Sequence, residues 1–343
     1  MKDKRIPGSA PDPLAVPAEP GTTRGHRLRA RAFRLGKIAL AVALVAVIAT
    51  VVDGQEALRL LRGADPRWLL AAFVLLSLQT VLSAFRWRLT ARQLDQVIGK
   101  RHAVGEYYLS QVINQTLPGG MLGDAGRAMR LRGMAGLRLA GLGVALERVA
   151  GQVGMVAVMA VGLVVSALVP GGLSPPDWLA WTVLGICAGL VVSWAVMRRA
   201  GALPGGLGRA LGQLAFDSGR ALAAPGVLWR QVALSLATAA CNLLAFAACA
   251  RATGTVLSPG AVAVLVPLIL FAMLIPVTIS GWGLREGAAA TLLPLAGTTG
   301  AEGLAASIAY GLVFLAAVSP GLWPLIGGRR GQKDTRAVRP PED

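Results

Sequence analysis

Charged residues are scarce in this chain. Asp, Glu, Lys and Arg make up only 15% of its 343 residues, whereas roughly 25% is typical of a soluble domain. Hydrophobic residues make up 55%, and the mean hydropathy is +0.60. The composition therefore excludes an ordinary soluble domain and predicts an integral membrane protein.

Cysteine and histidine are also rare, with three and two residues. Cys187, Cys241 and Cys249 lie in apolar runs, without the spacing of a zinc site or a disulfide framework. His26 and His102 lie in basic loops and lack metal-ligand spacing. No nucleotide-binding loop is evident either. We therefore expect no metal and no cofactor.

Acidic residues are half as frequent as basic ones, 17 against 34, which gives a formal net charge of +17. Such an excess could indicate a nucleic-acid partner. Lys and Arg, however, occur in blocks between apolar runs, and in a membrane protein such blocks mark cytoplasmic loops. They also attract anionic lipid headgroups. We therefore expect membrane lipids, and no nucleic acid, as partners.

Six apolar runs are long enough to cross a bilayer, which takes about 20 residues. They are Leu35–Val52, Trp68–Phe85, Leu139–Val169, Trp178–Met197, Gln231–Ala250 and Gly303–Ile326. We predict a basic, disordered tail over residues 1–34, a membrane domain over 35–326 and a second basic tail over 327–343. The membrane domain divides into halves at about 35–169 and 178–326.

The distribution of Lys and Arg predicts the orientation. Nine lie within residues 1–37, nine between residues 86 and 138, five between 198 and 230, and five after residue 326. The other connections carry few. Because basic loops stay inside, both termini are expected in the cytoplasm of a multi-pass plasma (inner) membrane protein.

Two further segments, Val104–Leu122 and Ala261–Ile279, are interrupted in the same way. A shift of 158 positions superimposes a proline, a glycine and an arginine of one on those of the other. The residues predicted to break or hinge these segments are Pro118, Gly119, Gly120, Gly123, Pro276, Gly281 and Gly283. Broken apolar segments at matching places in two halves indicate the binding site of a transporter.

The topology places both ends of the first segment inside and both ends of the second outside. We therefore predict two re-entrant hairpins that enter from opposite sides, in an inverted repeat of about six full crossings. Irregular backbone at membrane depth must be buried in protein or line a wet cavity, so the hairpin tips should meet near the midplane. Alternatively, each hairpin is two short spans, or Ala261–Ile279 simply crosses.

Ionisable residues within or beside these segments should face the protein interior and pair with one another. The predicted charge network is Asp124, Glu147, Arg148 and Glu286, around one cavity. The residues predicted to bind a headgroup are Arg127, Arg285, Asn114 and Trp282. Guanidinium suits phosphate, and a helix that begins after each break would attract an anion. One alternative is ion pairing that only locks the hairpins in place, and another is that Arg127 lies at the cytoplasmic interface.

Three motifs resemble a known family. They are Leu117-Pro118-Gly119-Gly120 with Gly123-Asp124 and Arg127, then Glu147-Arg148 with Gly151, then Pro276 with Gly281-Trp282-Gly283 and Arg285-Glu286. Together they resemble the flippase-like integral membrane family named for the transmembrane region of lysylphosphatidylglycerol synthase. The resemblance implies a protein that binds or moves anionic lipids. Its best-known members carry a fused synthase domain, which is not expected here, so aminoacyl transfer is not expected either.

We predict an all-α polytopic membrane protein that moves an anionic phospholipid or a polyprenyl-phosphate-type lipid between leaflets. One half would rock against the other around the site. A lipid-modifying enzyme is a further candidate partner. The alternatives are an integral membrane transferase acting on a polyprenyl-phosphate lipid and a noncatalytic scaffold for a lipid or glycan synthase.

Overall fold

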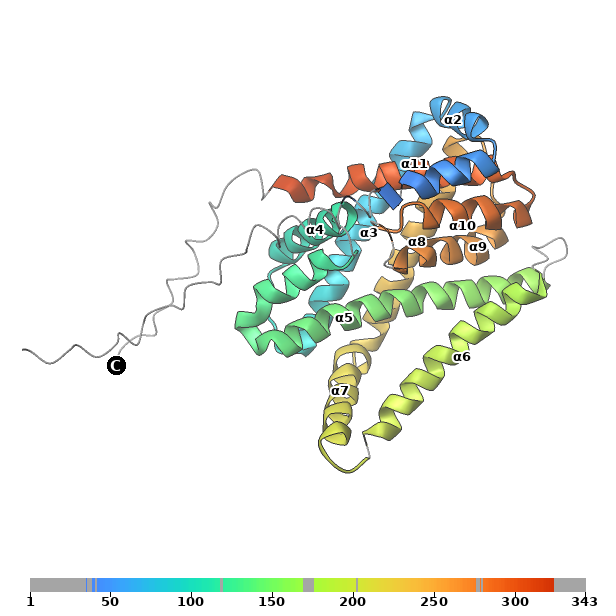
Figure 1. The fold of residues 1–343 in the computed structure, drawn as a ribbon. Helices are drawn as coiled ribbons and strands as arrows, with labels where there is room; N and C mark the ends of the chain where they lie inside the picture. The colour runs from blue at the N-terminus through green and yellow to red at the C-terminus, as the bar shows by residue number, and fades with distance from the viewer. Residues whose placement is uncertain are drawn as a thin grey trace, which may run out of the picture.

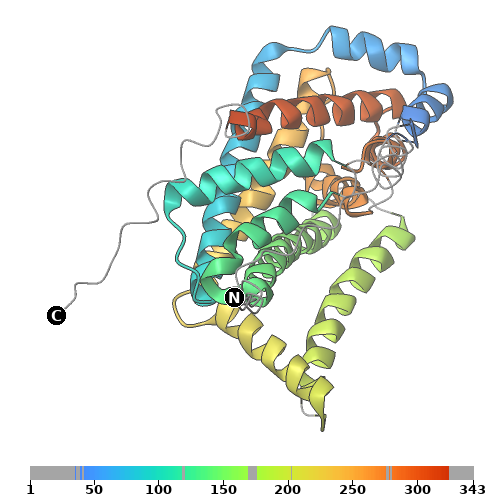
Figure 2. The same cartoon turned by 60° about the vertical axis from the view of Figure 1, so that its left-hand side comes forward.

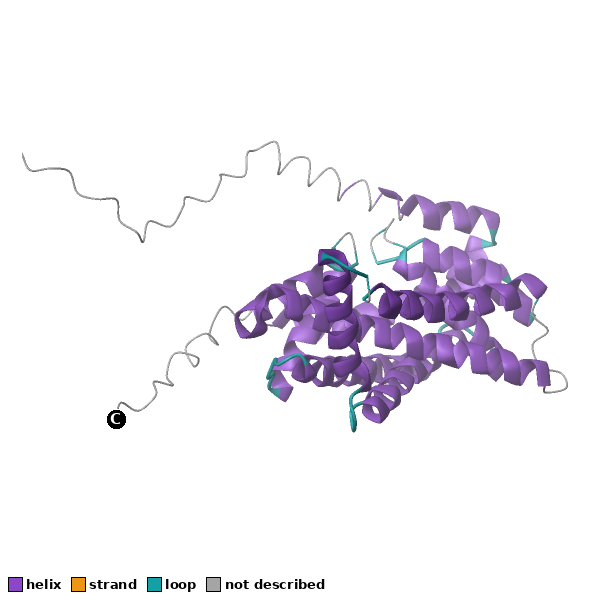
Figure 3. Ribbon diagram, turned by 90° about the horizontal axis from the view of Figure 1, so that it is seen from below, coloured by secondary structure: helices purple, strands orange, loops and turns teal. Residues whose placement is uncertain are grey.

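The computed structural model describes residues 35, 39–40, 42–117, 120–168, 176–201, 203–275, 278 and 280–323. Within these ranges every regular element is a helix, which confirms the predicted all-α class (Figure 3). The tails predicted over residues 1–34 and 327–343 lie outside the described residues.

The helices follow one another along the chain with short connections (Figure 1). They are α2 (Gly54–Arg62), α3 (Pro66–Gln93), α4 (Lys100–Thr116), α5 (Leu122–Leu168), α6 (Asp177–Ala200), α7 (Gly206–Ala223), α8 (Leu228–Ala252), α9 (Pro259–Phe271), η1 (Ala272–Leu274), α10 (Leu284–Leu292), η2 (Leu293–Ala296), α11 (Gly300–Val318) and η3 (Ser319–Leu322). The short amphipathic helices α2 and α7 do not belong to any run that hydropathy selects.

Five of these helices are long and apolar enough to cross a membrane, namely α3, α5, α6, α8 and the segment from α11 through η3. They contain all or most of five of the six predicted spans. The remaining span, Leu35–Val52, is described in part, with an apolar helix over Val42–Val51. The chain is therefore a multi-pass membrane protein.

The first broken segment forms a hairpin. Helix α4 forms the first arm, the chain then turns, and α5 begins at Leu122 and packs against α4. The turn includes Gly120, whose φ is +62°, while Pro118 and Gly119 lie outside the described residues. Helix α5 is itself interrupted at Ala135 and Gly136, where the backbone is not helical. The returning arm is thus residues 122–134, and the crossing helix is 137–168.

The second broken segment forms a similar hairpin from α9 and α10, which pack together. Gly281 and Gly283 in its turn have φ of +74° and +87°, and a Cβ on Gly281 would lie 2.5 Å from the Met273 Cα. Only glycine fits such a position. Pro276 lies outside the described residues, whereas Pro267 lies inside α9 without ending it.

The two hairpins lie at opposite ends of the bundle in Figure 1. Ser280, in the second turn, donates a hydrogen bond to the Gln115 Oε1 near the end of α4. Helices α3 and α8, which hold corresponding places in the two halves, make the most extensive helix contact in the described bundle. This arrangement agrees with the predicted inverted repeat of two opposed hairpins.

Helix α6 stands apart from the centre of the bundle in Figures 1 and 2. It packs against α5 and α7, and its large apolar side chains are exposed, with Trp181 at 70%. Such a surface suits contact with lipid. The core lies instead among α3, α8, α9 and α11, around buried residues such as Leu76, Phe246 and Leu265.

Candidate functional site

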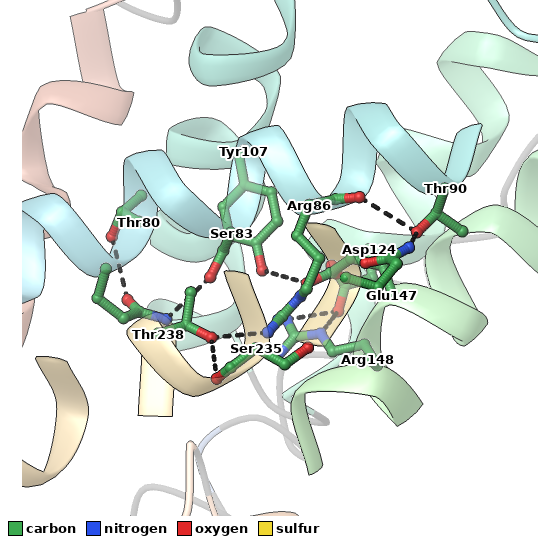
Figure 4. Close-up of polar contacts among 12 residues, drawn as sticks. Thr80, Ser83, Arg86, Thr90, Tyr107, Asp124, Glu147, Arg148, Ser235 and Thr238 are labelled. Atoms are coloured by element: carbon green, nitrogen blue, oxygen red, sulfur yellow. Dashed lines mark hydrogen bonds and ion pairs between the residues drawn. The ribbon is translucent and has the colours of Figure 1, made fainter. Parts of the chain in front are cut away.

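A buried ion pair joins α3 to α5 in the first half. The Arg86 Nη2 and Nε donate to the Glu147 Oε1 at 2.6 and 3.2 Å, and the Nη1 donates to the Thr238 Oγ1 of α8 at 2.7 Å (Figure 4). The Tyr107 hydroxyl of α4 also donates to the Glu147 Oε1, at 3.2 Å. Four helices are thus held by one carboxylate and one guanidinium.

Room for this arginine comes from a glycine. A Cβ on Gly151 would lie 2.7 Å from the Arg86 Nη2, so a larger residue there would displace the guanidinium. The spacing of four places Gly143, Glu147 and Gly151 on one face of α5, where small residues leave room for a neighbour. The structure shows the arginine side chain, rather than a backbone, in the space beside Gly151.

Arg127, in the returning arm of the first hairpin, continues the network. Its side chain is fully buried, and its Nη2 donates to the Asp124 Oδ1 at 3.0 Å and lies 3.4 Å from the Glu147 Oε2. The guanidinium carbon lies 4.3 Å from the centre of the Trp87 ring and 4.6 Å from that of Tyr107. Both aromatic faces therefore contribute to holding this cation.

Asp124 connects the hairpin to the crossing part of α5. It accepts hydrogen bonds from Ser110 and Asn114 of α4, at 2.9 and 3.2 Å, and from Arg148, whose Nη2 lies 2.6 Å from the Asp124 Oδ2. The Asn114 Oδ1 in turn accepts from the Gly123 N–H at 2.8 Å. Asn114, predicted to bind a headgroup, thus ties the two arms of the hairpin together.

Gly123 lets those arms approach closely. A Cβ at this position would lie 2.0 Å from the Ser110 carbonyl oxygen, so the predicted role of Gly123 at the break has a definite steric reason.

This first network, defined as Arg86, Arg127, Arg148, Asp124 and Glu147, carries an excess of positive charge. Three arginines against two carboxylates leave +1. Four of the five residues are buried, and the Arg148 side chain is 33% exposed. Uncompensated charge at membrane depth is costly, so the network favours an additional anion.

A cavity of about 100 Å³ adjoins this network. Its lining comes from α3, α4, α5 and α8, and includes Arg86 and Arg148. The cavity lies near the middle of these helices. Gln79 is the fourteenth of 28 residues in α3, Gln152 lies midway between residues 136 and 168, and Ala239 is next to the middle of α8.

A second network lies in the other hairpin. The Arg285 Nε donates to the Glu286 Oε1 at 3.1 Å and to the Ser307 Oγ of α11 at 3.0 Å, and the Glu286 Oε2 accepts from the Gly283 N–H at 2.7 Å. The Arg285 guanidinium carbon also lies 5.0 Å from the Trp282 ring and 5.4 Å from the Tyr310 ring. Arg285 and Glu286 are both buried and their charges balance.

The six predicted ionisable residues therefore form two networks, not one cluster around one cavity. Within the described chain, no ion pair or hydrogen bond joins Arg285 or Glu286 directly to the first network. An indirect path exists, because Tyr310 donates to the Asn242 Oδ1 at 3.1 Å and Asn242 lines the cavity.

The structure also separates the predicted headgroup residues from the cavity. Arg127, Arg285, Asn114 and Trp282 do not line it, and both arginines have carboxylate partners. Direct headgroup contact by these four residues remains a prediction. Helices do begin after each break as expected, at Leu122 and at Leu284.

Arg86 is the main functional residue that the sequence patterns do not predict, because it opens a basic block of the kind that marks a cytoplasmic loop. A signal was present in the spacing of polar residues along an apolar helix. Gln79, Ser83, Arg86 and Thr90 recur at intervals of three and four and are all buried, which indicates one interior face.

Helices long and apolar enough to cross a membrane, two broken hairpins and a charged cavity near the middle of its lining helices define a polytopic membrane protein with an internal polar site. The family model described as "Lysylphosphatidylglycerol synthase TM region" matches residues 34–320, and the chain belongs to this family of membrane proteins in lipid-related processes. Neither a curated protein nor a solved structure matches the chain significantly.

Proposed function

We propose that the protein binds the anionic headgroup of a lipid in the cavity beside the first network and moves that lipid between leaflets. The observation that carries the proposal is the net charge of +1 on a largely buried network that adjoins a cavity near the middle of its lining helices. A phosphate would neutralise this charge, and guanidinium groups are well suited to hold it.

In this mechanism Arg148 makes the first contact, because its side chain is 33% exposed and lines the cavity. Arg86, almost buried and fixed by Glu147 and Thr238, provides the second positive charge. Direct contact is thus assigned to these two arginines, while Arg127 and Asp124 hold the hairpin in place. The lipid tails remain in the bilayer, and the two halves rock about the site.

The family membership supports a lipid as cargo. We further propose residence in the plasma membrane with both termini in the cytoplasm, transport without chemical change of the lipid, and a lipid-modifying enzyme as a candidate partner. A transferase acting on a polyprenyl-phosphate lipid is the alternative, and it predicts a change in the mass of the lipid.

The test uses purified protein in vesicles that carry a fluorescent anionic phospholipid. We expect the lipid to change leaflet with unchanged mass. Arg148→Gln should slow this movement, whereas Arg138→Gln should not, because Arg138 pairs with Asp217 and does not line the cavity. Equal rates for the wild type and Arg148→Gln would refute the assigned site, and a change of lipid mass would favour the transferase.

A further inference from the structure

The lining of the cavity is rich in amide side chains. Gln79, Gln111, Gln152 and Asn242 contribute four amides beside the two arginines, and the described lining residues include no Asp or Glu. An amide offers two donors and an acceptor, and a hydroxyl offers one donor and two acceptor lone pairs. The lining is therefore complementary to a phosphate that carries hydroxyl groups.

One of these amides has no partner within the described chain. Gln111 accepts from Arg148, Gln79 donates to Ser83, and Asn242 accepts from Tyr310. Gln152 makes no side-chain hydrogen bond with any described residue, although it lines the cavity and is only partly exposed. Its amide is thus available to a ligand.

The carboxylates near the cavity are not available to a cation. Glu147 is fully buried and bound to Arg86 and Arg127, and Asp124 is bound to Arg127 and Arg148. A positively charged headgroup would meet the exposed part of Arg148 and find no unpaired carboxylate among the described lining residues. Like charges brought together out of water repel strongly.

We propose that the cargo is a phospholipid whose headgroup beyond the phosphate is a small, uncharged polyol, and that the cavity selects against headgroups bearing a cationic amine. The volume of about 100 Å³ is well below the roughly 300 Å³ at which sites for drug-sized ligands begin, so the cavity fits one short polyol rather than a chain of sugars. This inference rests on the proposed function and specifies its substrate class.

Three fluorescent lipids distinguish the headgroup features that the cavity recognises. Phosphatidylglycerol carries a phosphate and a polyol, phosphatidylethanol carries the same phosphate without a free hydroxyl, and lysylphosphatidylglycerol adds a cationic amine. In phosphatidylcholine vesicles containing the purified protein, we expect phosphatidylglycerol to move about tenfold faster than phosphatidylethanol, since buried polar groups would be left unpaired with the latter. Lysylphosphatidylglycerol should be slowest.

Substitution of Gln152 tests the assignment within the protein. Gln152→Met should reduce the rate for phosphatidylglycerol to that for phosphatidylethanol. Gln152→Glu should slow phosphatidylglycerol and accelerate lysylphosphatidylglycerol, because it places a carboxylate in the cavity. Gln55→Glu adds the same charge on the exposed surface of α2 and should change neither rate.

The outcomes separate the inference from the function on which it rests. Equal rates for phosphatidylglycerol and phosphatidylethanol, or faster movement of lysylphosphatidylglycerol by the wild type, would overturn the polyol assignment while leaving lipid movement intact. Movement of none of the three lipids by a folded, reconstituted protein would overturn both.

Discussion

Replacing Glu147 with glutamine should destabilise the bundle more than any surface substitution. The carboxylate is fully buried and interacts with Arg86, Arg127 and Tyr107. Glu147→Gln keeps the size of the side chain but raises the charge of the first network from +1 to +2. Breaking a buried pair by removing one partner costs about 3–5 kcal/mol, and we expect a loss of that size in the free energy of unfolding.

The measurement is equilibrium unfolding in detergent micelles, followed by tryptophan fluorescence. Glu106→Gln is the matched control, because Glu106 pairs with Arg130 at 2.6 Å and this pair is open to solvent, with the Glu106 side chain 12% and the Arg130 side chain 37% exposed. A surface pair contributes about 0–1 kcal/mol, so the control should remain close to the wild type.

A double variant separates charge from packing. Arg86→Met with Glu147→Leu removes one charge of each sign and leaves the network at +1. It should recover most of the stability that Glu147→Gln loses, because replacing a buried ion pair with apolar residues is often neutral. Equal, small losses for Glu147→Gln and Glu106→Gln would refute the reasoning, since they would mean that the carboxylate is not buried and paired.

Two further substitutions test the second hairpin. Gly311→Ala places a Cβ 2.3 Å from the Arg285 Nη2 and should cost about 1–3 kcal/mol of unfolding free energy. The control is Gly105→Ala, which has open space around it and should stabilise α4 by up to about 1 kcal/mol. Thermal unfolding of both variants is the measurement, and a neutral Gly311→Ala would contradict the prediction. Ser280→Ala removes the hydrogen bond to Gln115 that joins the hairpin turns. It should slow lipid movement in vesicles while lowering the free energy of unfolding by only about 1 kcal/mol. An unchanged rate would show that this contact between the turns does not matter for transport.

The helices and their breaks could be predicted because their causes are local. Apolar runs of sufficient length, interrupted by Pro and Gly, predicted most of the crossing helices and both hairpins. The helices α2 and α7 could not be predicted in this way, because short amphipathic segments contain no long apolar run. The interruption of α5 at Ala135 and Gly136 was missed as well, since the hydrophobic pattern does not reveal which glycine of many bends a helix.

The pairing of charges could be predicted only in part, because it depends on contacts distant in sequence. Glu147 was recognised as an interior carboxylate, but its principal partner, Arg86, lies 61 positions away. The equivalence of Arg127 and Arg285 in the repeat suggested equivalent roles in one cluster. Their partners differ, however, since Arg285 pairs with the adjacent Glu286 whereas Arg127 shares the acids of α5.

The unequal charge of the two networks bears on how the membrane voltage would act on a transport cycle. The pair in the second hairpin is neutral, whereas the first network has a single uncompensated positive charge. A monoanionic phosphate would cancel that charge, so the loaded site would be electrically silent and the empty site would not. Since a full membrane crossing by one charge is worth about 2.3 kcal/mol per 100 mV, the return of the empty site is the step that an applied potential would speed or slow.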